Sequence, residues 1–158
     1  MSGFTCDVQL PVTPERVFGV LADLTGLPKR IPGIRRIEVE TPEPVGVGTR
    51  FRETRVMFGR EATERFEITR LTTNRAMKLV CESCGCRYEV DYLLSPDGSG
   101  TRLVLSYTIT PLTFFARMVG RLMGSKGAEM CRKSMTEDLN ALRASLLEER
   151  PESGNSLK

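Results

Sequence analysis

The chain contains no histidine among its 158 residues. Histidine is the commonest general base at neutral pH and the commonest metal ligand in proteins, so its absence removes the most frequent catalytic and metal-binding arrangements. Acid–base chemistry, if there is any, has to come from other titratable side chains such as carboxylates. We expect no metal site, and the sequence indicates no cofactor.

Long apolar runs and blocks of like charge are also missing. No uninterrupted apolar stretch could span a bilayer, and Met1–Leu10 lack the basic start and apolar run of a secretion signal. The 23 lysines and arginines and the 20 acidic residues are scattered, which leaves a net charge of +3 without a basic patch. We therefore expect a cytoplasmic protein with no stable membrane insertion and no nucleic-acid partner.

Length and composition are those of one domain, because 158 residues with 40% hydrophobic content can bury a real core but not two ordinary ones. We assign residues 1–150 to a single domain. Residues 151–158 have too little apolar content to pack and are expected to form a disordered tail. Five cysteines, an odd number in a chain without a secretion signal, indicate reduced thiols.

The first part of the chain reads as a strand followed by a short helix. Apolar and polar residues alternate over 4–10, which is typical of a strand with one buried face. Thr13-Pro14-Glu15 then provides a capping hydroxyl, a proline at the first helical position and an early negative charge. This predicts a helix to about Asp23, at most one further helical turn, and a second strand over 34–40.

Two strand-like segments, 49–58 and 61–71, flank Gly59-Arg60 and predict a hairpin. If Phe58 pairs with Glu61, the facing pairs are Arg55 with Glu64, Met57 with Ala62 and Glu53 with Phe66. One face of the hairpin would then carry Phe51, Glu53, Arg55, Met57, Ala62, Glu64, Phe66 and Ile68. A slip of one residue would turn all of these side chains to the other face.

Three further strands are predicted over 76–83, 86–94 and 101–110, separated by turns that include Pro96-Asp97-Gly98-Ser99-Gly100. Alternation in the second and third of these strands places Tyr88, Tyr92 and Tyr107 on inward-facing positions. Each tyrosine offers an apolar ring and a hydroxyl that can orient a ligand carbonyl or hydroxyl. The alternative is ordinary aromatic core with the hydroxyl bonded to backbone.

The last long segment, 111–150, is predicted to be one helix that begins at Thr110-Pro111. Its second half carries an apolar stripe at spacings of three and four, formed by Ala128, Cys131, Met135, Leu139, Leu142 and Leu146. Its first half, 111–127, contains Gly120, Gly124 and Gly127, each of which lowers helix stability by about 1 kcal/mol relative to alanine. We expect a bent or mobile front half and a firm back half.

This order of elements resembles the START-like, helix-grip superfamily (SRPBCC), and within it the bacterial polyketide cyclase/dehydrase and lipid-transport-like branch. The resemblance covers about residues 4–149, and the segments that carry it are 13–18, 31–33, 47–53, 58–60 and 97–103. It implies an α+β fold in which a curved antiparallel sheet of about seven strands wraps around a long C-terminal helix, with one or two short helices after the first strand. It also implies a deep, mostly apolar cavity between sheet and helix, used in different members for lipids, polyketides, plant hormones or quinones.

Glu53, Arg55 and Glu64 are the candidate catalytic residues, because the predicted register aims all three into the cavity. A buried carboxylate either pairs with arginine or shifts its pKa upward. One with a raised pKa could remove a proton next to a ketone while Arg55 stabilised the enolate. The alternatives are a self-satisfied ion pair near the pocket rim, or a different register that leaves all three in water.

Three cysteines, Cys81, Cys84 and Cys86, lie close together at a predicted hairpin tip. Thiolates at this spacing could hold zinc, but a structural zinc site normally needs four ligands. No histidine can supply the fourth, and Cys6 and Cys131 belong to distant elements. Small residues at a tight turn are the favoured interpretation, with a redox-active pair as the alternative.

Apolar residues crowd the first half of the predicted long helix beside its glycines, among them Phe114, Phe115, Met118, Leu122 and Met123. Three interpretations remain open: packing onto the sheet, a gate that admits a hydrophobic ligand, and docking on a membrane or partner with cationic edges from Arg117, Arg121 and Lys126. The predicted ligand contacts are Phe51, Met57, Phe66, Met77, Leu79, Tyr88, Tyr92, Tyr107, Phe115, Met118, Leu122 and Met135.

Together these features favour a binding or carrier protein for a small hydrophobic molecule, which is lipid-, polyketide- or aromatic-like. The alternative is an enzyme of cyclase/dehydrase type in which Glu53 or Glu64 carries the proton and Arg55 or a tyrosine holds an oxyanion. A third hypothesis is a protein-interaction module that uses the sheet. A continuous cavity enclosing a tyrosine and a carboxylate would favour the first two.

Overall fold

The computed structural model describes residues 2–57 and 59–149, so the predicted disordered tail, 151–158, lies outside the described residues. Within the described part, the strands are β1 (Ser2–Leu10), β2 (Ile34–Val39), β3 (Arg50–Met57), β4 (Arg60–Thr72), β5 (Ala76–Ser83), β6 (Cys86–Asp97) and β7 (Gly100–Pro111). The helices are α1 (Pro14–Ala22), the 3₁₀ helix η1 (Leu24–Lys29), α2 (Phe114–Met123) and α3 (Lys126–Glu148).

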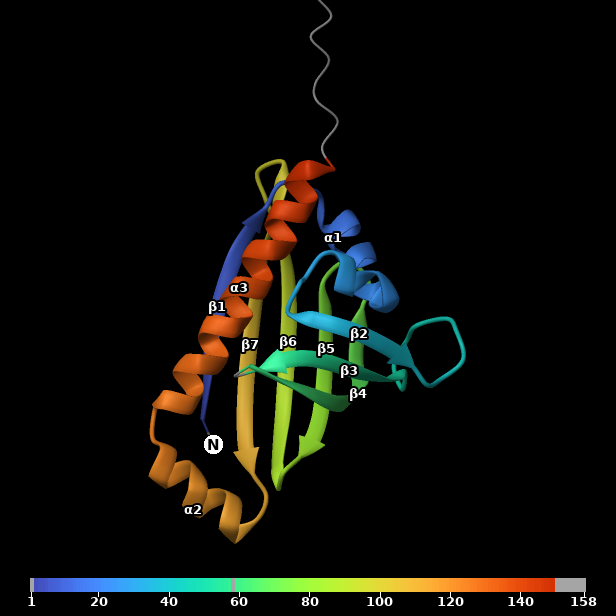
Figure 1. The fold of residues 1–158 in the computed structure, drawn as a ribbon. Coiled ribbons are helices and arrows are strands. Elements are labelled where there is room, and N and C mark those ends of the chain that lie inside the picture. Colours follow the sequence, from blue (N-terminus) through green and yellow to red (C-terminus); the bar gives the residue numbers. More distant parts are fainter. Residues whose placement is uncertain (1, 58, 150–158) are drawn as a thin grey trace, which may run out of the picture.

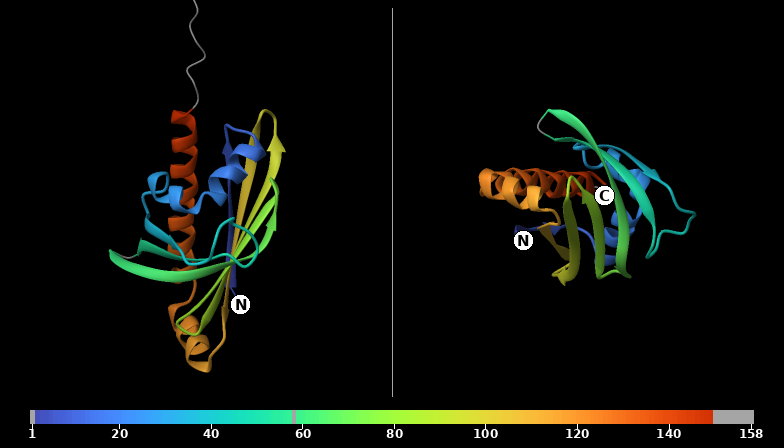
Figure 2. Two further views of the ribbon diagram at one scale, coloured as in Figure 1. Left: turned by 90° about the vertical axis from the view of Figure 1, so that its right-hand side faces the viewer. Right: turned by 90° about the horizontal axis from the view of Figure 1, so that it is seen from below.

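The strands form one antiparallel sheet in the order β1-β7-β6-β5-β4-β3-β2. Figure 1 shows α3 lying along the sheet, and the view from below in Figure 2 shows the sheet curving around that helix. Register shifts between Ile34 and Arg36 in β2 and between Ile68 and Arg70 in β4 mark bulges, which increase the bend of a strand. The predicted α+β helix-grip fold is confirmed.

The stripe predicted for the long helix holds α3 against the sheet. Met135, Leu139, Leu142 and Leu146 are all buried, and Ala128 and Cys131 are half-buried nearer the start of the helix. Because these side chains recur every three or four residues, they lie on one helical face and meet the concave side of the sheet. The predicted apolar stripe is therefore the face of α3 that packs against the sheet.

Helices α1 and η1 close one end of the space between sheet and α3. The Thr13 hydroxyl caps α1 by accepting a hydrogen bond from the backbone N–H of Arg16 at 3.4 Å, as the sequence predicts. Val17 and Leu21 of α1 and Leu24 and Leu27 of η1 are buried in the core. Their apolar side chains close this end of the interior.

The register predicted for the β3–β4 hairpin is wrong by two residues. Met57 pairs with Arg60, and Glu53 therefore faces Glu64 instead of Phe66, while Arg55 faces Ala62. Gly59 has a positive φ of 75° and directly precedes β4, so the loop lies one residue earlier than expected. A shift of two positions preserves the alternation, and the same side chains still point to the concave face.

The predicted single helix over 111–150 is divided into two. Pro111 is the last residue of β7, where it pairs with Cys86, and the cap of α2 is Thr113, which accepts a hydrogen bond from the backbone N–H of Ala116 at 3.1 Å. Helix α2 ends at Gly124, whose φ of 59° and ψ of −143° suit glycine. Across the described ranges, no helix is long and apolar enough to cross a bilayer.

Candidate functional site

Two neighbouring cavities lie between the sheet and α3. The larger, of about 250 Å³, extends to Cys131 and Met135 in the first half of α3. The smaller, of about 40 Å³, reaches Leu139 and Leu142 further along that helix and the side chains of α1 and η1. Glu53, Arg55, Leu79 and Tyr92 line both cavities. These four residues therefore form the boundary between an inner apolar space and an outer binding cavity.

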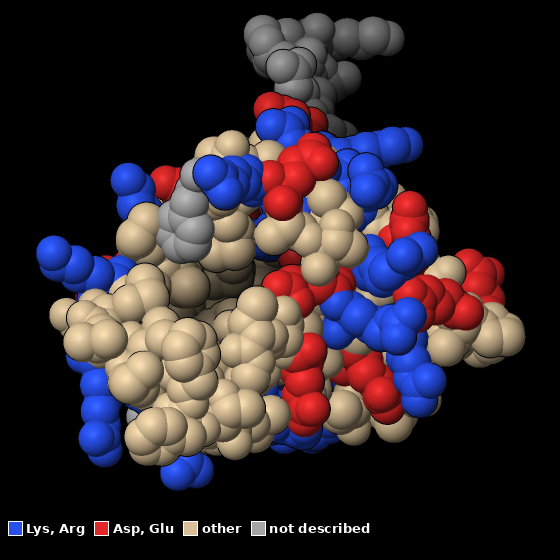
Figure 3. Space-filling model, turned by 60° about the horizontal axis from the view of Figure 1, so that its bottom comes forward, with Lys and Arg blue, Asp and Glu red and all other residues tan. Residues whose placement is uncertain are grey.

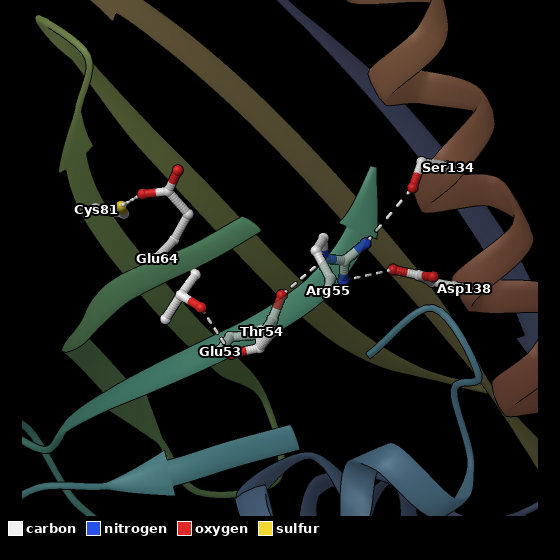
Figure 4. A network of polar contacts seen from close by, with 8 residues as sticks. Glu53, Thr54, Arg55, Glu64, Cys81, Ser134 and Asp138 are labelled. Atoms are coloured by element: carbon white, nitrogen blue, oxygen red, sulfur yellow. Dashed lines mark hydrogen bonds and ion pairs between the residues drawn. The ribbon is translucent and has the colours of Figure 1, made fainter. Parts of the chain in front are cut away.

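Arg55 is the centre of a buried polar network at this boundary (Figure 4). Its Nε donates to Glu53 Oε1 at 2.8 Å within β3, and its Nη2 donates to Asp138 Oδ2 of α3 at 2.9 Å. Its Nη1 lies 3.5 Å from the Ser134 hydroxyl one turn earlier on that helix. The charged side chains are only 10–13% exposed. One guanidinium therefore joins the sheet to α3 and forms ion pairs with two carboxylates.

The charges in this network control each other's pKa. Burial alone would lower the pKa of Arg55, but the neighbouring carboxylates of Glu53 and Asp138 outweigh it and raise the pKa, so this arginine stays protonated. Burial raises the pKa of Asp138, and the charge of Arg55 offsets only part of that rise. Both carboxylates already hold the Arg55 guanidinium through its Nε and Nη2, so its positive charge is largely compensated within the protein.

Glu64 lies on the wall of the larger cavity, away from the Arg55 network (Figure 4). The Ser83 hydroxyl donates to its Oε1 at 3.2 Å and the Cys81 thiol donates to its Oε2 at 3.4 Å. No lysine or arginine among residues 2–57 and 59–149 forms an ion pair with Glu64. The two candidate carboxylates thus have different surroundings, because Glu53 is neutralised by Arg55 whereas Glu64 has only neutral donors.

All three tyrosines line the larger cavity, as their strand positions predict. Burial raises the pKa of Tyr88, Tyr92 and Tyr107, so each hydroxyl stays protonated and can donate a hydrogen bond. No hydrogen bond joins the hydroxyl of Tyr92 or Tyr107 to another described residue, and within the described chain no fully buried polar side-chain atom lacks a partner. These two hydroxyls are therefore open to the cavity.

The structure brings together nine of the predicted ligand contacts and separates three. Lining one or both cavities are Phe51, Met57, Phe66, Met77, Leu79, Tyr88, Tyr92, Tyr107 and Met135. Phe115, Met118 and Leu122 line neither cavity, because they belong to α2 and are 68%, 44% and 81% exposed. The separation follows from the break at Gly124, which directs α2 away from the space that α3 covers.

The cysteine cluster does not form a metal site among the described residues. Cys81 is buried and donates to Glu64, whereas Cys84 is exposed at the β5–β6 turn with a positive φ of 51°. Burial, followed by the charge of Glu64, raises the pKa of the Cys81 thiol to about 12. The cysteine cluster therefore contributes the Cys81 thiol to the cavity wall and the Cys84 thiol to the surface.

Sequence reasoning missed the contribution of α3 to the polar network. Asp138 lies three residues after Met135 and four before Leu142, so it shares the buried face of the helix. A carboxylate within an apolar stripe is a signal that it has a partner, because an isolated buried charge is costly. Only the fold shows that the partner is Arg55, 83 positions earlier in the chain.

A hollow opens on the face shown in Figure 3, beside a broad surface without charged side chains. The side chains named above place the larger cavity between α3 and the central strands, and the α3 residues that line it, Cys131 and Met135, come from the half of the helix that follows α2. The site is therefore an apolar chamber with hydroxyl donors and one carboxylate, Glu64, that pairs with no cation among the described residues.

Comparison with known families finds one that covers nearly the whole chain. Residues 1–146 match the family described as polyketide cyclase / dehydrase and lipid transport. A comparison with curated proteins finds no match.

Similar solved structures include protein TTHA0849 from Thermus thermophilus, with 25% identity over 95% of this chain and 100% of that chain and a TM-score of 0.75. A START superfamily protein from Mycobacterium smegmatis has 12% identity over 92% and 97% of the two chains and a TM-score of 0.76. The ZhuI aromatase/cyclase from Streptomyces sp. R1128 has 17% identity over 97% and 98% and a TM-score of 0.74. At 12% and 17% identity, the similarity to the last two proteins shows a shared fold and nothing further.

Proposed function

Because the chain belongs to the polyketide cyclase/dehydrase and lipid transport family, we propose that it binds a small, largely hydrophobic molecule between its sheet and α3. The observation that carries this proposal is the cavity of about 250 Å³ with apolar walls and three tyrosines. Such a chamber with a few directed polar groups is the usual form of a small-molecule site. A carrier that holds its ligand without changing it is the function that this geometry supports best.

The lining also indicates the chemistry of the ligand. Tyr92 and Tyr107 offer hydroxyl donors that have no hydrogen-bond partner among the described residues, so the ligand needs at least one carbonyl or hydroxyl oxygen. The rest of the wall, including Met57, Phe66 and Leu79, requires an apolar body. The volume of about 250 Å³ lies just below the roughly 300–1,000 Å³ of typical ligand sites, which favours a compact ring system or a single short chain over a two-chain lipid.

Intrinsic fluorescence offers a direct test. The chain has three tyrosines and no tryptophan, and all three tyrosines line the larger cavity, so tyrosine emission reports on this site. Titration with small polycyclic phenols and with short unsaturated fatty acids should quench this emission saturably for at least one class. Native mass spectrometry of protein purified from its host should show a retained small molecule. Absence of both signals would contradict the proposal.

A second candidate function, a cyclase/dehydrase-type enzyme, is favoured by the surroundings of Glu64. This carboxylate has neutral donors and no cationic partner within the described part of the chain, so it is better suited than Glu53 to accept a proton. Glu64 would remove a proton from the carbon next to a ketone. The electron pair left on that carbon then attacks a second carbonyl carbon of the same molecule and forms the new carbon–carbon bond. The new alkoxide recovers the proton, and a tyrosine hydroxyl stabilises the oxygen charge.

Glu64→Gln distinguishes the two functions. The amide keeps the size of the side chain but cannot carry the proton, so a carrier should retain its ligand affinity whereas an enzyme should lose turnover of a poly-ketone substrate by about a hundredfold or more. Glu61→Gln is the matched control, because Glu61 lies on the same strand and is exposed. Unchanged turnover in Glu64→Gln would exclude Glu64 as the proton carrier.

A further inference from the structure

Helix α2 presents its apolar side to solvent. Phe114 and Leu122 are more than 80% exposed, and Phe115, Met118 and Met123 are between 44% and 68% exposed. Only Ala116 is buried in this helix. Phe114, Met118 and Leu122 are spaced by four residues and therefore lie along one line of the helix. Monomeric proteins rarely expose contiguous apolar surface of this kind without a partner for it.

Positive charge accompanies this apolar surface. Residues 112–128 contain Arg117, Arg121 and Lys126 and no acidic residue. Arg117 and Arg121 lie next to the Phe114 line on the helix circumference, and no ion pair engages either arginine within the chain as described. In Figure 3, lysine and arginine side chains lie along the outer edge of the uncharged surface, and acidic side chains interspersed with further basic ones lie on its other side.

The connection of α2 to the sheet holds this surface in place. The Leu112 backbone N–H donates to the Gly85 carbonyl at 2.8 Å, and the Thr113 hydroxyl caps the helix. Gly85 has a positive φ of 74°, and a β-carbon there would lie 2.7 Å from the Thr113 hydroxyl oxygen. The β5–β6 turn and the start of α2 therefore touch closely, which fixes the helix at the end of the molecule that holds Cys81 and the larger cavity.

From these observations we propose that α2 docks this end of the protein onto an anionic lipid bilayer surface. The helix lies in the plane of the interface with Phe114, Phe115, Met118 and Leu122 among the acyl chains. Arg117 and Arg121 meet the phosphate groups, where each cation near an anionic membrane adds to the attraction. Docking is peripheral and reversible, in agreement with the absence of a spanning helix among the described residues.

The charges favour a bilayer over a second copy of the chain. A two-fold contact between two α2 helices would bring Arg117 and Arg121 of one copy next to the same residues of the other. Like charges at such a contact repel each other, whereas a layer of anionic headgroups neutralises them. If the cavity binds a hydrophobic molecule, as proposed above, docking places the cavity next to the lipid bilayer, in which such a molecule dissolves. The docking proposal itself does not depend on the proposed ligand binding.

Vesicle co-sedimentation tests the proposal with the full chain and no added ligand. We expect binding to vesicles of phosphatidylcholine with phosphatidylglycerol, weak binding to phosphatidylcholine alone, and release as salt increases. Phe114→Ser/Phe115→Ser/Leu122→Ser should weaken binding by at least about tenfold. Arg117→Gln/Arg121→Gln should weaken binding by about fivefold for each arginine.

Matched variants on other surfaces serve as controls. Val47, in the loop between β2 and β3, and Leu93, in β6, are apolar residues that are 67% and 47% exposed, so Val47→Ser/Leu93→Ser should bind vesicles as the unmodified protein does. Arg36→Gln/Arg65→Gln removes the same charge from exposed strand positions and should have little effect. The α2 residues to be changed are exposed, so circular dichroism should show each variant folded.

Several outcomes would overturn the proposal. The first is folded protein that stays in the supernatant with anionic vesicles, and the second is α2 variants that bind as tightly as the unmodified chain. A third is a dimer in light scattering that the α2 substitutions convert to monomer without any effect on vesicles, because the occupant would then be a second copy. Tyrosine fluorescence titration is scored separately, so a failure of docking is distinguishable from a failure of ligand binding.

Discussion

The guanidinium of Arg55 on β3 lies 2.9 Å from the carboxylate of Asp138 on α3, so a buried ion pair joins the curved sheet to the long helix. Both side chains are about nine-tenths buried, and Glu53 completes the group at 2.8 Å. The pair stands at the boundary between the two cavities. It therefore affects both the stability of the fold and the shape of the site.

Arg55→Met should be strongly destabilising. The substitution leaves the carboxylates of Glu53 and Asp138 buried without a cation, and breaking a buried pair in this way costs about 3–5 kcal/mol. Urea denaturation followed by circular dichroism measures the loss. Arg102→Met is the control, because the Arg102–Asp7 pair is exposed and should change stability by less than about 1 kcal/mol. Equal effects in the two variants would contradict the structural role given to Arg55.

Asp138→Asn should change the pH dependence of stability. Burial raises the folded-state pKa of Asp138 above its ordinary value of 3.8, so the folded chain holds this proton more tightly than the unfolded chain does. The contribution of Asp138 to stability is therefore full below about pH 3.8 and falls as the pH rises through the folded-state pKa. The stability difference between the unmodified protein and Asp138→Asn should shrink over that window in urea titrations. If the stability difference widened as the pH rises, the charge of Arg55 would have a larger effect on the pKa of Asp138 than burial has.

The sequence predicts the strands and their inward faces well because a period of two residues decides which face a side chain takes. The error of two positions in the β3–β4 register leaves Phe51, Glu53, Arg55 and Met57 on the concave side as expected. It nevertheless changes every facing pair, since Gly59 indicates a turn without giving its place within the loop. Residue faces are therefore more predictable than residue partners.

The course of the chain after β7 could not be predicted in the same way. Thr110-Pro111 has the pattern of a helix start, but a proline also fits the end of a strand, and Thr113 supplies the cap. The apolar spacing of Phe114, Met118 and Leu122 is the same whether a helix faces a core or solvent. Only the break at Gly124 shows that this face is exposed. The contact of Asp138 with Arg55 is likewise set by tertiary structure.

Tyr92→Phe and Tyr107→Phe should separate ligand binding from stability. Neither hydroxyl has a hydrogen-bond partner among the described residues, so its removal should change the free energy of unfolding by less than about 1 kcal/mol. Affinity for an oxygen-bearing ligand that uses the hydroxyl should fall about three- to tenfold in fluorescence titrations.

Thr101→Val is the control for these tyrosine variants. Its hydroxyl donates to the Val12 carbonyl at 2.7 Å and the side chain is fully buried. Loss of that bond removes the side-chain donor of a partly buried carbonyl, and the variant should lose about 1–3 kcal/mol of stability without a direct effect on the ligand. A large stability loss in the tyrosine variants would show that their hydroxyls have a structural role.

The cysteines near the β5–β6 turn should react with thiol reagents at very different rates. Cys84 is exposed, whereas Cys81 is buried with its pKa raised to about 12. At about pH 8, only about one Cys81 thiol in ten thousand is ionised, and the thiolate is the reactive form. Timed alkylation with peptide mass spectrometry should label Cys84 early and Cys81 last. Glu64→Gln removes a nearby negative charge and should speed Cys81 labelling, and faster labelling of Cys81 than of Cys84 in the unmodified protein would contradict this assignment.

Gly124→Ala should disturb the junction between α2 and α3, whereas Gly120→Ala should not. Gly124 has φ 59° and ψ −143°, a conformation that costs a residue with a β-carbon about 1–3 kcal/mol. Gly120 lies inside α2, and a β-carbon there would meet nothing within 4 Å, so alanine should stabilise that helix by about 0.5–1 kcal/mol.

Hydrogen exchange of the α2 amides measures both effects. Protection should fall in Gly124→Ala and rise in Gly120→Ala, while the amides around Leu142 in α3 should change little because that part of the helix is buried against the sheet. If Gly124→Ala instead extended protection continuously from α2 into α3, the two helices would have joined into one. The apolar face of α2 would then be redirected, and vesicle binding should fall in the same variant. Increased protection across the junction with unchanged vesicle binding would show that docking does not require the break.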